Sequence, residues 1–319
     1  MVLVNILHMN IGDGESSYAN NSMLQKTGIQ EAVPFLRHSI RGLANYDVFK
    51  DYIIVADLGC SSSTNTLLVA SNIIDIVHEV CQENNRKPPQ FQKEKGESFG
   101  PCVVSAVPGT FYDRLFLDKS LHIVHSANSN HWLSEVPQGL ENNGSNIYIT
   151  KTSPPNVYRA YGEQFHTDFT STADPTTDDC CALLELLGQS LINMMKEGLV
   201  RESDINSFNV PVYFPCEHEV RNAIEYDGSF SLENMNFFKV NWDPHDTDYT
   251  NMNDSLELSQ IHGENASKLL RAVLEPLLVS HFGNSIIDVL FGKFGKHVGE
   301  YLLRQKTRYF FTTISLIKK

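Results

Sequence analysis

Basic side chains are scarce in this 319-residue sequence, in which 25 lysines and arginines stand against 38 aspartates and glutamates. The formal net charge is -13. A surplus of negative charge repels phosphate backbones and anionic lipid headgroups. We therefore expect no nucleic-acid partner and no membrane partner.

Long apolar runs and paired cysteines are also missing. No stretch reaches the ~20 apolar residues that a membrane span needs. The first residues carry no basic region, and Asn5 and His8 interrupt their apolar stretch, so they are not typical of a signal peptide. The six cysteines include no C-x-x-C pair, which favours reduced thiols. These features predict a cytoplasmic protein.

Two common catalytic signatures are absent as well: G-x-x-x-x-G-K-[ST] and H-E-x-x-H. Their absence argues against a P-loop nucleotide site and a zincin site. What the chain does have is 41% hydrophobic residues, enough for a large core. Its length suggests two domains, or one elaborated α/β domain with an added cap.

The first half of the chain alternates between strand and helix patterns. Residues 52–58 form a short apolar run that ends in Asp57 and Leu58 before Gly59, as expected of a buried parallel strand. Helix-spaced apolar residues follow, and 101–108, 121–125 and 146–150 indicate further strands. A strand, a tight turn of small residues and a helix are the first unit of a doubly wound sheet.

The second half is mainly helical. Apolar spacing predicts helices over 178–196 and 265–280, and 309–317 indicates a strand that returns to the sheet. The polar stretch 240–262 indicates a loop. Four of its side chains could hold a metal ion, although a solvated charged face is the favoured interpretation. They are Asp243, His245, Asp246 and Asp248.

Two loops carry the strongest local signals. Gly59, at the end of the first strand, lets backbone amides approach a nucleoside-bearing ligand, or it serves an ordinary strand turn. The stretch 125–132 offers hydroxyls, amides, an imidazole and Trp132, which suits a pocket with an apolar wall. The alternative is a capped helix start with Trp132 in the core. The residues alone leave both choices open.

Motifs along nearly the whole chain resemble one family, the plant SABATH methyltransferases. They are Leu7–Met9, Gly14–Ala19 with Asn21 and Ser22, Ala56–Ser61, Val107–Tyr112 with Arg114–Phe116, His131–Ser134 with Val136 and Pro137, Ser207–Pro211, Glu275–Pro276 and His281–Gly283. The resemblance implies methyl transfer from S-adenosylmethionine. It also implies an α/β fold, a Rossmann-like methyltransferase sheet with an α-helical cap, and a homodimer.

The same resemblance implies which residues form the site. The cofactor positions are Tyr18, Ser22, Asp57, Gly59, Cys60, Asn65, Thr110, Phe111 and Ser126. The acceptor positions are Tyr18, Gln25, Asn128, His131, Trp132, Leu183, Leu184, Tyr213, Leu270, Val273 and Tyr309, with Gln25, His131 and Trp132 as the catalytic set. A magnesium ion would fall at Asn143, Asn206, Phe208 and Asn209.

The chain departs from the family at several points. Ser63 and Thr64 replace the usual Gly-Pro, Asn128 an aromatic, Leu184 a tryptophan common in salicylate-type members, and Asn206 an acid. Two stretches that the family normally carries are missing, at 92–93 and at 174–175. The first would contain the strand whose terminal Asp binds the ribose hydroxyls, and the second a central strand.

The expected function is transfer of a methyl group to the carboxylate of a small plant acid, giving a methyl ester. An N-methyltransferase of a purine alkaloid is the alternative, with Tyr309 and Asn128 binding ring carbonyls. A non-catalytic binder of a small ligand is the third. We expect a methyltransferase domain over 1–175 with an amino-terminal closing arm, a helical cap over 176–300 and a returning strand over 301–319.

Overall fold

The structure is a computed structural model of the chain, and it describes residues 8–44, 52–61, 64–88, 105–169, 178–246 and 255–319. The chain divides into two compact units. The smaller unit is Gly28–Asn130, and the larger consists of the residues up to Thr27 together with His131–Lys319. The expected domain borders at residues 175 and 300 stay a prediction.

The smaller unit contains a pair of parallel strands. β1 (Val55–Leu58) pairs with β2 (Ile123–Ser126), with Val55 opposite Ile123 and Leu58 opposite Ser126. Because the strands are parallel, their carboxyl ends lie at the same edge. Both strands were predicted from their apolar runs, and both predictions are confirmed.

Two helices provide the core of the smaller unit. α1 (Met23–Ala44) and α2 (Asn65–Glu83) share a buried cluster that includes Ile40, Ile76 and Val77. The buried positions of α2 recur at helical spacing, which explains why the sequence predicted this helix. An ion pair between Arg37 and Glu79, 3.0 Å apart, also joins the two helices. It is half-exposed and therefore contributes little to stability.

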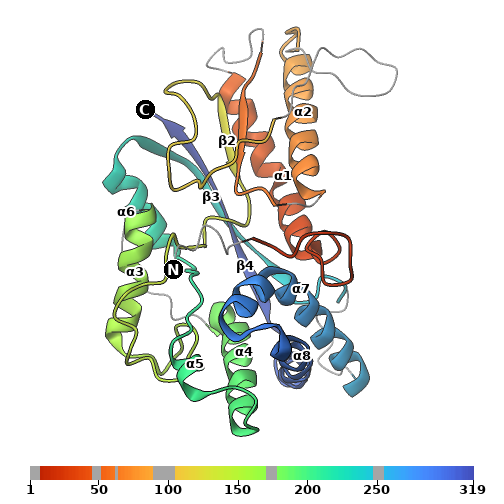
Figure 1. Cartoon of the computed structure of the whole chain (residues 1–319). Coiled ribbons are helices and arrows are strands. Elements are labelled where there is room, and N and C mark those ends of the chain that lie inside the picture. The colour runs from red at the N-terminus through yellow and green to blue at the C-terminus, as the bar shows by residue number, and fades with distance from the viewer. Residues whose placement is uncertain (1–7, 45–51, 62–63, 89–104, 170–177, 247–254) are drawn as a thin grey trace. The chain divides into compact units, whose positions relative to one another are not determined.

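The larger unit contains most of the helices (Figure 1). They are α3 (Pro155–Phe169), α4 (Asp178–Lys196), α5 (Glu202–Asn206), α6 (Glu217–Asp227), α7 (Leu256–Phe282), the short 3-10 helix η2 (Asn284–Ile286) and α8 (Ile287–Leu302). The prediction of α4 is confirmed residue for residue. α7 and α8 lie side by side, and their backbones come very close at Gly263, where an added Cβ would lie 2.6 Å from Gly299 N.

A long antiparallel ribbon completes the larger unit. β3 (Phe230–Asn241) pairs with β4 (Arg308–Lys318), with Val240 opposite Tyr309. On this face Phe238 stacks on Phe311, with ring centroids 5.2 Å apart. The strand predicted over 309–317 is thus confirmed as β4, whereas its return to the sheet of the first half of the chain stays a prediction. Within the described residues it pairs with β3 alone.

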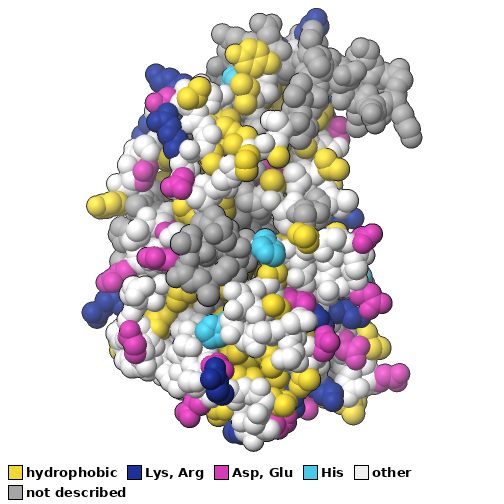
Figure 2. Space-filling view, in the orientation of Figure 1, with side chains coloured by type: hydrophobic (Ala, Val, Ile, Leu, Met, Phe, Trp, Pro, Cys, Tyr) yellow, Lys and Arg dark blue, Asp and Glu magenta, His cyan; other side chains and the backbone are white. Residues whose placement is uncertain are grey.

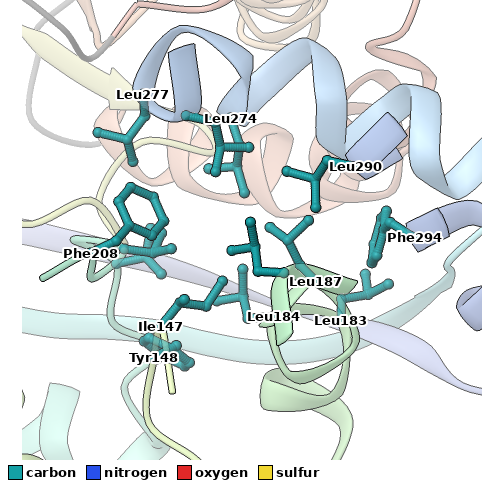
Figure 3. Packing of buried hydrophobic residues seen from close by; sticks show 14 of the residues in the cluster. Ile147, Tyr148, Leu183, Leu184, Leu187, Phe208, Leu274, Leu277, Leu290 and Phe294 are labelled. Atoms are coloured by element: carbon teal, nitrogen blue, oxygen red, sulfur yellow. The ribbon is translucent and has the colours of Figure 1, made fainter. Parts of the chain in front are cut away.

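The main core lies between α4, α7 and α8. In Figure 3, Leu183, Leu184 and Leu187 project from α4 among side chains that include Leu274, Leu290 and Phe294. Leu187, Leu290 and Phe294 are completely buried. Trp132 and Tyr213 belong to the same cluster. The core therefore extends to the loop that the sequence marked as a candidate pocket.

Charged side chains are distributed over the visible surface. On the face drawn in Figure 2, acidic side chains are scattered and intermixed with lysines and arginines. Among the helices that the structure describes, none combines the length and the apolar character needed to cross a bilayer.

The predicted loop over 240–262 is wrong at both ends. β3 continues to Asn241, and α7 begins at Leu256, so the helix expected over 265–280 starts earlier. The Ser255 hydroxyl accepts a hydrogen bond from Leu258 N and caps this helix. Its first turns look polar because Ser259 and His262 occupy buried positions where apolar residues are usual. Residues 247–254 lie outside the described residues.

Two other strand predictions also need correction. Ile147, Tyr148 and Ile149 are buried, but residues 146–150 form no strand. Their backbone is held instead by Val210 N, which donates to Ile147 O, and by the Asn143 amide, which donates to Tyr148 O. Of the strand expected over 101–108, residues 105–108 are irregular, and the rest lie outside the described residues.

The acidic cluster of the predicted loop is not a solvated face. Asp243 is 2% exposed, and its carboxylate accepts from Asn265 Nδ2 at 2.9 Å and lies 2.7 Å from His262 Nδ1. Asp246 pairs with the buried Lys306 ammonium at 3.0 Å. The described residues include no group of three or more His, Cys, Asp or Glu side chains that could hold a metal ion. Asp248 is not among them.

Candidate functional site

Gly59 turns the chain sharply where β1 ends. Its φ of +73° lies in the left-handed region that favours glycine. A Cβ at this position would collide with the Ser129 side chain and would lie 3.3 Å from the Phe111 ring. Ser129 Oγ in turn donates to Leu58 O and lies 3.1 Å from Ser126 Oγ. Gly59, Phe111 and Ser126 thus lie around the Ser129 side chain or the Gly59 turn, and their role as cofactor positions stays a prediction.

Asp57 has a partner that the sequence did not reveal. Its Oδ1 lies 2.7 Å from Nδ1 of His125, the residue opposite it in the parallel pairing. Both side chains are about one-fifth exposed, at 21% and 20%. A proton on Nδ1 donates to the carboxylate and fixes its orientation at the carboxyl edge of the strands.

The remaining cofactor positions of the smaller unit lie on the neighbouring turns. Cys60 is exposed and follows Gly59, and Asn65 is buried as the first residue of α2. Thr110 O accepts from Asp113 N in the turn that carries Phe111. Thr64 precedes α2 and makes no side-chain capping hydrogen bond among the described residues.

His131 and Trp132, two of the residues expected to be catalytic, begin a segment of the larger unit that is held by hydrogen bonds at both ends. Trp132 lies opposite Val212 in an antiparallel bridge, and Tyr213 N donates to His131 O at 2.7 Å. At the other end, the Asp168 carboxylate accepts from both Ser134 N (2.8 Å) and Ser134 Oγ (2.7 Å). α3 supplies Asp168, so this helix fixes the segment that presents the indole and imidazole rings.

The His131 imidazole is uncharged. Its ring stacks on Phe214 with centroids 5.5 Å apart and lies beside Trp132. Burial lowers the pKa of His131 from 6.5 to about 4. At neutral pH this residue is therefore a neutral hydrogen-bonding group and offers no positive charge to an acceptor.

This low pKa predicts a pH dependence of stability. Between pH 6.5 and about 4 the unfolded chain binds a proton on His131 that the folded chain does not, so stability falls as pH falls through that window. We expect the urea midpoint of the wild type to drop more between pH 7 and pH 5 than that of His131→Gln. Tryptophan fluorescence measures both, and equal drops would contradict the assignment.

Tyr213 presents its ring alone to the predicted acceptor site. The side chain is completely buried, and its hydroxyl donates to Glu219 Oε1. Glu219 is itself fully buried and also accepts from Cys216 N at the start of α6. Phe165 packs against the Tyr213 ring at 5.1 Å. The hydroxyl of Tyr213 is therefore already engaged within the larger unit.

The other acceptor positions of the larger unit come from three elements. Leu183 and Leu184 lie on α4, Leu270 and Val273 on α7, and Tyr309 on β4. All five belong to the main core cluster or pack against it. Burial raises the pKa of Tyr309, which keeps its hydroxyl protonated.

The arm before α1 and the first turn of α1 contribute buried polar side chains. Tyr18, Ser22 and Gln25 are 7%, 5% and 8% exposed. Burial raises the pKa of Tyr18 to about 12, so its hydroxyl stays a donor. Gln25 Oε1 is buried without a hydrogen-bond partner among the described residues. Such an atom costs about 1–3 kcal/mol unless a ligand or water satisfies it.

Asn128, the remaining acceptor position, belongs to the smaller unit and has a φ of +56°.

Known proteins match this chain along its whole length. The family described as SAM dependent carboxyl methyltransferase matches residues 4–93, 90–172 and 170–319. The chain belongs to this family. A benzoic acid/salicylic acid carboxyl methyltransferase of Petunia hybrida is 36% identical over all of this chain and 99% of its own length. Jasmonate O-methyltransferase of Arabidopsis thaliana is 34% identical over the full length of both chains.

A solved structure extends the likeness to the fold of this methyltransferase. A loganic acid methyltransferase with SAH superimposes with a TM-score of 0.80 at 26% identity, covering 98% of each chain. The predicted fold class, a Rossmann-like methyltransferase sheet with an α-helical cap, is confirmed by this match.

The methyltransferase is shorter than its relatives at internal positions. The family matches in three stretches that meet at residues 90–93 and 170–172. The alignment with the Petunia relative spans 367 residues against 319 here, so that relative has residues without a counterpart in this chain. These two meeting points lie within a few residues of positions 92–93 and 174–175, where the sequence analysis expects stretches of the family to be missing. Both positions lie outside the described residues.

The sequence analysis did not find the residues that hold the predicted site residues in place. His125, Asp168, Glu219 and Ser129 each hold a predicted site residue or the segment that carries one. Only His125 and Ser129 had a sequence signal, since both lie in the 125–132 stretch. Asp168 lies 34 residues from Ser134, and Glu219 lies six residues from Tyr213 in a stretch without a motif, so neither contact could be deduced from the sequence.

Proposed function

We propose that this methyltransferase transfers a methyl group from S-adenosylmethionine to the carboxylate of a small plant acid. The relatives named above act on benzoic, salicylic or jasmonic acid by name. The observation that carries the proposal is the buried, unpartnered amide oxygen of Gln25, in the unit that also holds His131 and Trp132. An amide in such a place is poised for a ligand, because it can present its NH₂ group after a simple flip.

Positioning supplies most of the expected catalysis. The bound cofactor provides a methyl group on a sulfonium that leaves as a neutral thioether, so an ionised carboxylate needs no general base. The protein has to align the acceptor oxygen and exclude water. Gln25 and Trp132 offer N–H donors that hold one carboxylate oxygen while the other attacks. Tyr213, Leu183 and Leu184 form apolar walls.

Two assays test the proposal. Calorimetry with S-adenosylhomocysteine should show binding in the micromolar range, even though the chain lacks the first internal stretch. A radiolabelled methyl-transfer screen with salicylate, benzoate, jasmonate, indoleacetate and methylxanthines should then give a product that mild base hydrolyses, as expected of an ester. A base-stable product would favour the N-methyltransferase alternative. Absence of both binding and transfer would favour a non-catalytic binder.

Trp132→Phe tests the role of the indole donor. Losing one hydrogen bond to a charged group costs about 1.5–3 kcal/mol, so we expect turnover to fall roughly 10- to 100-fold. Phenylalanine keeps the apolar contacts of this buried ring, so S-adenosylhomocysteine binding should change little. Steady-state kinetics and calorimetry measure the two effects. Unchanged turnover would remove Trp132 from the mechanism.

The residues expected to hold magnesium fit that ion poorly. Asn143 Oδ1 accepts from Ser153 Oγ and Asn206 Oδ1 from Ser145 Oγ, while Phe208 is a buried core residue. Asn209 Oδ1 alone is buried without a partner among the described residues. No carboxylate, the group Mg²⁺ prefers, belongs to this set. We expect excess EDTA to leave turnover unchanged. A loss that Mg²⁺ restores would contradict this.

The homodimer implied by the resemblance and the cytoplasmic location expected from the sequence stay predictions. Light scattering during size-exclusion chromatography would measure the mass in solution and decide the first. Microscopy of a fluorescent fusion in leaf cells would decide the second.

A further inference from the structure

Asn10 ties the amino-terminal arm, residues 8–22, to helix α7. Its backbone N donates to Ala272 O at 2.9 Å. Its side-chain Nδ2 donates to Glu275 Oε2 at 2.7 Å and to Ser16 O at 3.1 Å. Its backbone O accepts from Tyr18 N at 2.8 Å. One residue therefore links the turn that carries Tyr18 to the surface of α7.

Glu275 is the fixed end of this link. Arg271, one turn earlier on α7, donates through Nε to Glu275 Oε2 at 2.8 Å and through Nη2 to Oε1 at 3.3 Å. The Arg271 guanidinium also pairs with Asp288 of α8 at 2.8 Å. The Glu275 side chain is 15% exposed, so its bond to Asn10 is charge-assisted and partly shielded from water. Glu275 thus presents an oriented oxygen to the arm.

The rest of the arm depends on this attachment. Asn21 N donates to Ser17 O, and the Asn20 and Asn21 side chains donate to backbone carbonyls of residues 13–17. These bonds make the arm a compact turn with its own internal order. Where α1 begins, Leu24 packs with Leu269 of α7 and Val240 of β3. The arm is therefore attached to α7 on both sides of Tyr18 and Ser22.

We propose that Glu275, acting through Asn10, is a positioning residue that holds the arm against α7 and so places Tyr18 and Ser22 for the ligands. This inference rests on the proposed function, for which both side chains are expected ligand positions, Tyr18 for cofactor and acceptor and Ser22 for the cofactor. It gives a role to the Glu275–Pro276 motif, which the proposed reaction does not otherwise use. Neither Asn10 nor Glu275 touches a reacting atom.

A double-mutant cycle with Asn10→Ala and Glu275→Ala tests the link. Each single variant should raise the acceptor KM about tenfold, the size expected when one charge-assisted hydrogen bond is lost. The double variant should lose less than the sum of the two single losses, because both changes remove the bond between Asn10 and Glu275. Glu275→Gln keeps an acceptor oxygen for Asn10 and should recover part of the loss. Glu264→Ala, an exposed position on the same helix, should match the wild type.

Hydrogen exchange distinguishes a positioning role from general destabilisation. Amides of residues 8–22 should exchange at least tenfold faster in both single variants, while amides of α8 keep wild-type rates. The proposal is overturned by unchanged exchange in the arm, by additive effects on KM, or by faster exchange with an unchanged KM. If the wild type neither binds S-adenosylhomocysteine nor methylates any acid, the proposed function fails. Hydrogen exchange in the same Asn10 and Glu275 variants would then decide by itself whether Glu275 holds the arm.

Discussion

Replacing Gly59 with alanine is expected to reduce S-adenosylhomocysteine binding more than 100-fold, beyond the range of ordinary calorimetry. The added Cβ would collide with the Ser129 side chain, and the φ of +73° would be strained. Relief requires Ser129 to move and to give up its bond to Leu58 O, which also disturbs its contact with Ser126 Oγ at the end of β2. A 100-fold loss corresponds to about 2.7 kcal/mol, comparable to the strain and the broken contact together.

Gly139→Ala is the matched control for this variant. Gly139 has a similar φ of +80°, but an added Cβ would meet no atom within 4 Å. It should cost about 1 kcal/mol of stability and leave ligand binding unchanged. If Gly59→Ala binds the ligand like the wild type, Gly59 is an ordinary strand turn and not part of the cofactor site.

Replacing Gly263 with alanine is expected to destabilise the larger unit by about 3 kcal/mol or more. An added Cβ on α7 would collide with Gly295 O of α8 and lie 2.6 and 2.9 Å from Gly299 N and Cα. All three are backbone atoms, so the helices themselves would have to move apart. Thermal unfolding followed by circular dichroism should show a melting temperature lower by roughly 5–10 °C.

Gly292→Ala provides a control of opposite sign. This glycine lies inside α8, and an added Cβ would meet no atom within 4 Å. Alanine is a better helix former by about 0.8–1 kcal/mol, so this variant should melt slightly higher than the wild type. Equal melting temperatures for Gly263→Ala and the wild type would show that α7 and α8 do not pack as tightly as described.

The fold was predictable where periodicity was strong and unmixed. α4 and β4 were found because their apolar residues recur at helix or strand spacing over their whole length. The start of α7 was not predicted because two of its buried positions hold polar residues, Ser259 and His262, which interrupt the apolar pattern of the helix. Residues 147–149 were apolar because they are buried, and burial alone does not make a strand. A local pattern of apolar residues indicates which side chains are buried more reliably than it indicates which backbone segments pair as strands.

The site was predictable one residue at a time but not as a set of contacts. Gly59 and Trp132 stand in motifs that the sequence displays, and the structure brings Gly59 against Ser129 as such a turn requires. The contacts of Glu219 with Tyr213, and of Glu275 with Asn10, join residues whose spacing carries no periodic signal. Such contacts depend on the whole core and cannot be deduced from local sequence.

The uncharged imidazole of His131 has a consequence for product inhibition. None of the predicted acceptor positions is a lysine or arginine, so the sulfonium is the expected counter-charge for a bound carboxylate. That positive charge disappears in the same step that forms the neutral ester. A second acid molecule would then meet spent cofactor in a site without cationic attraction, and the resulting dead-end complex would be weak. High acid concentrations should therefore not trap the enzyme after turnover.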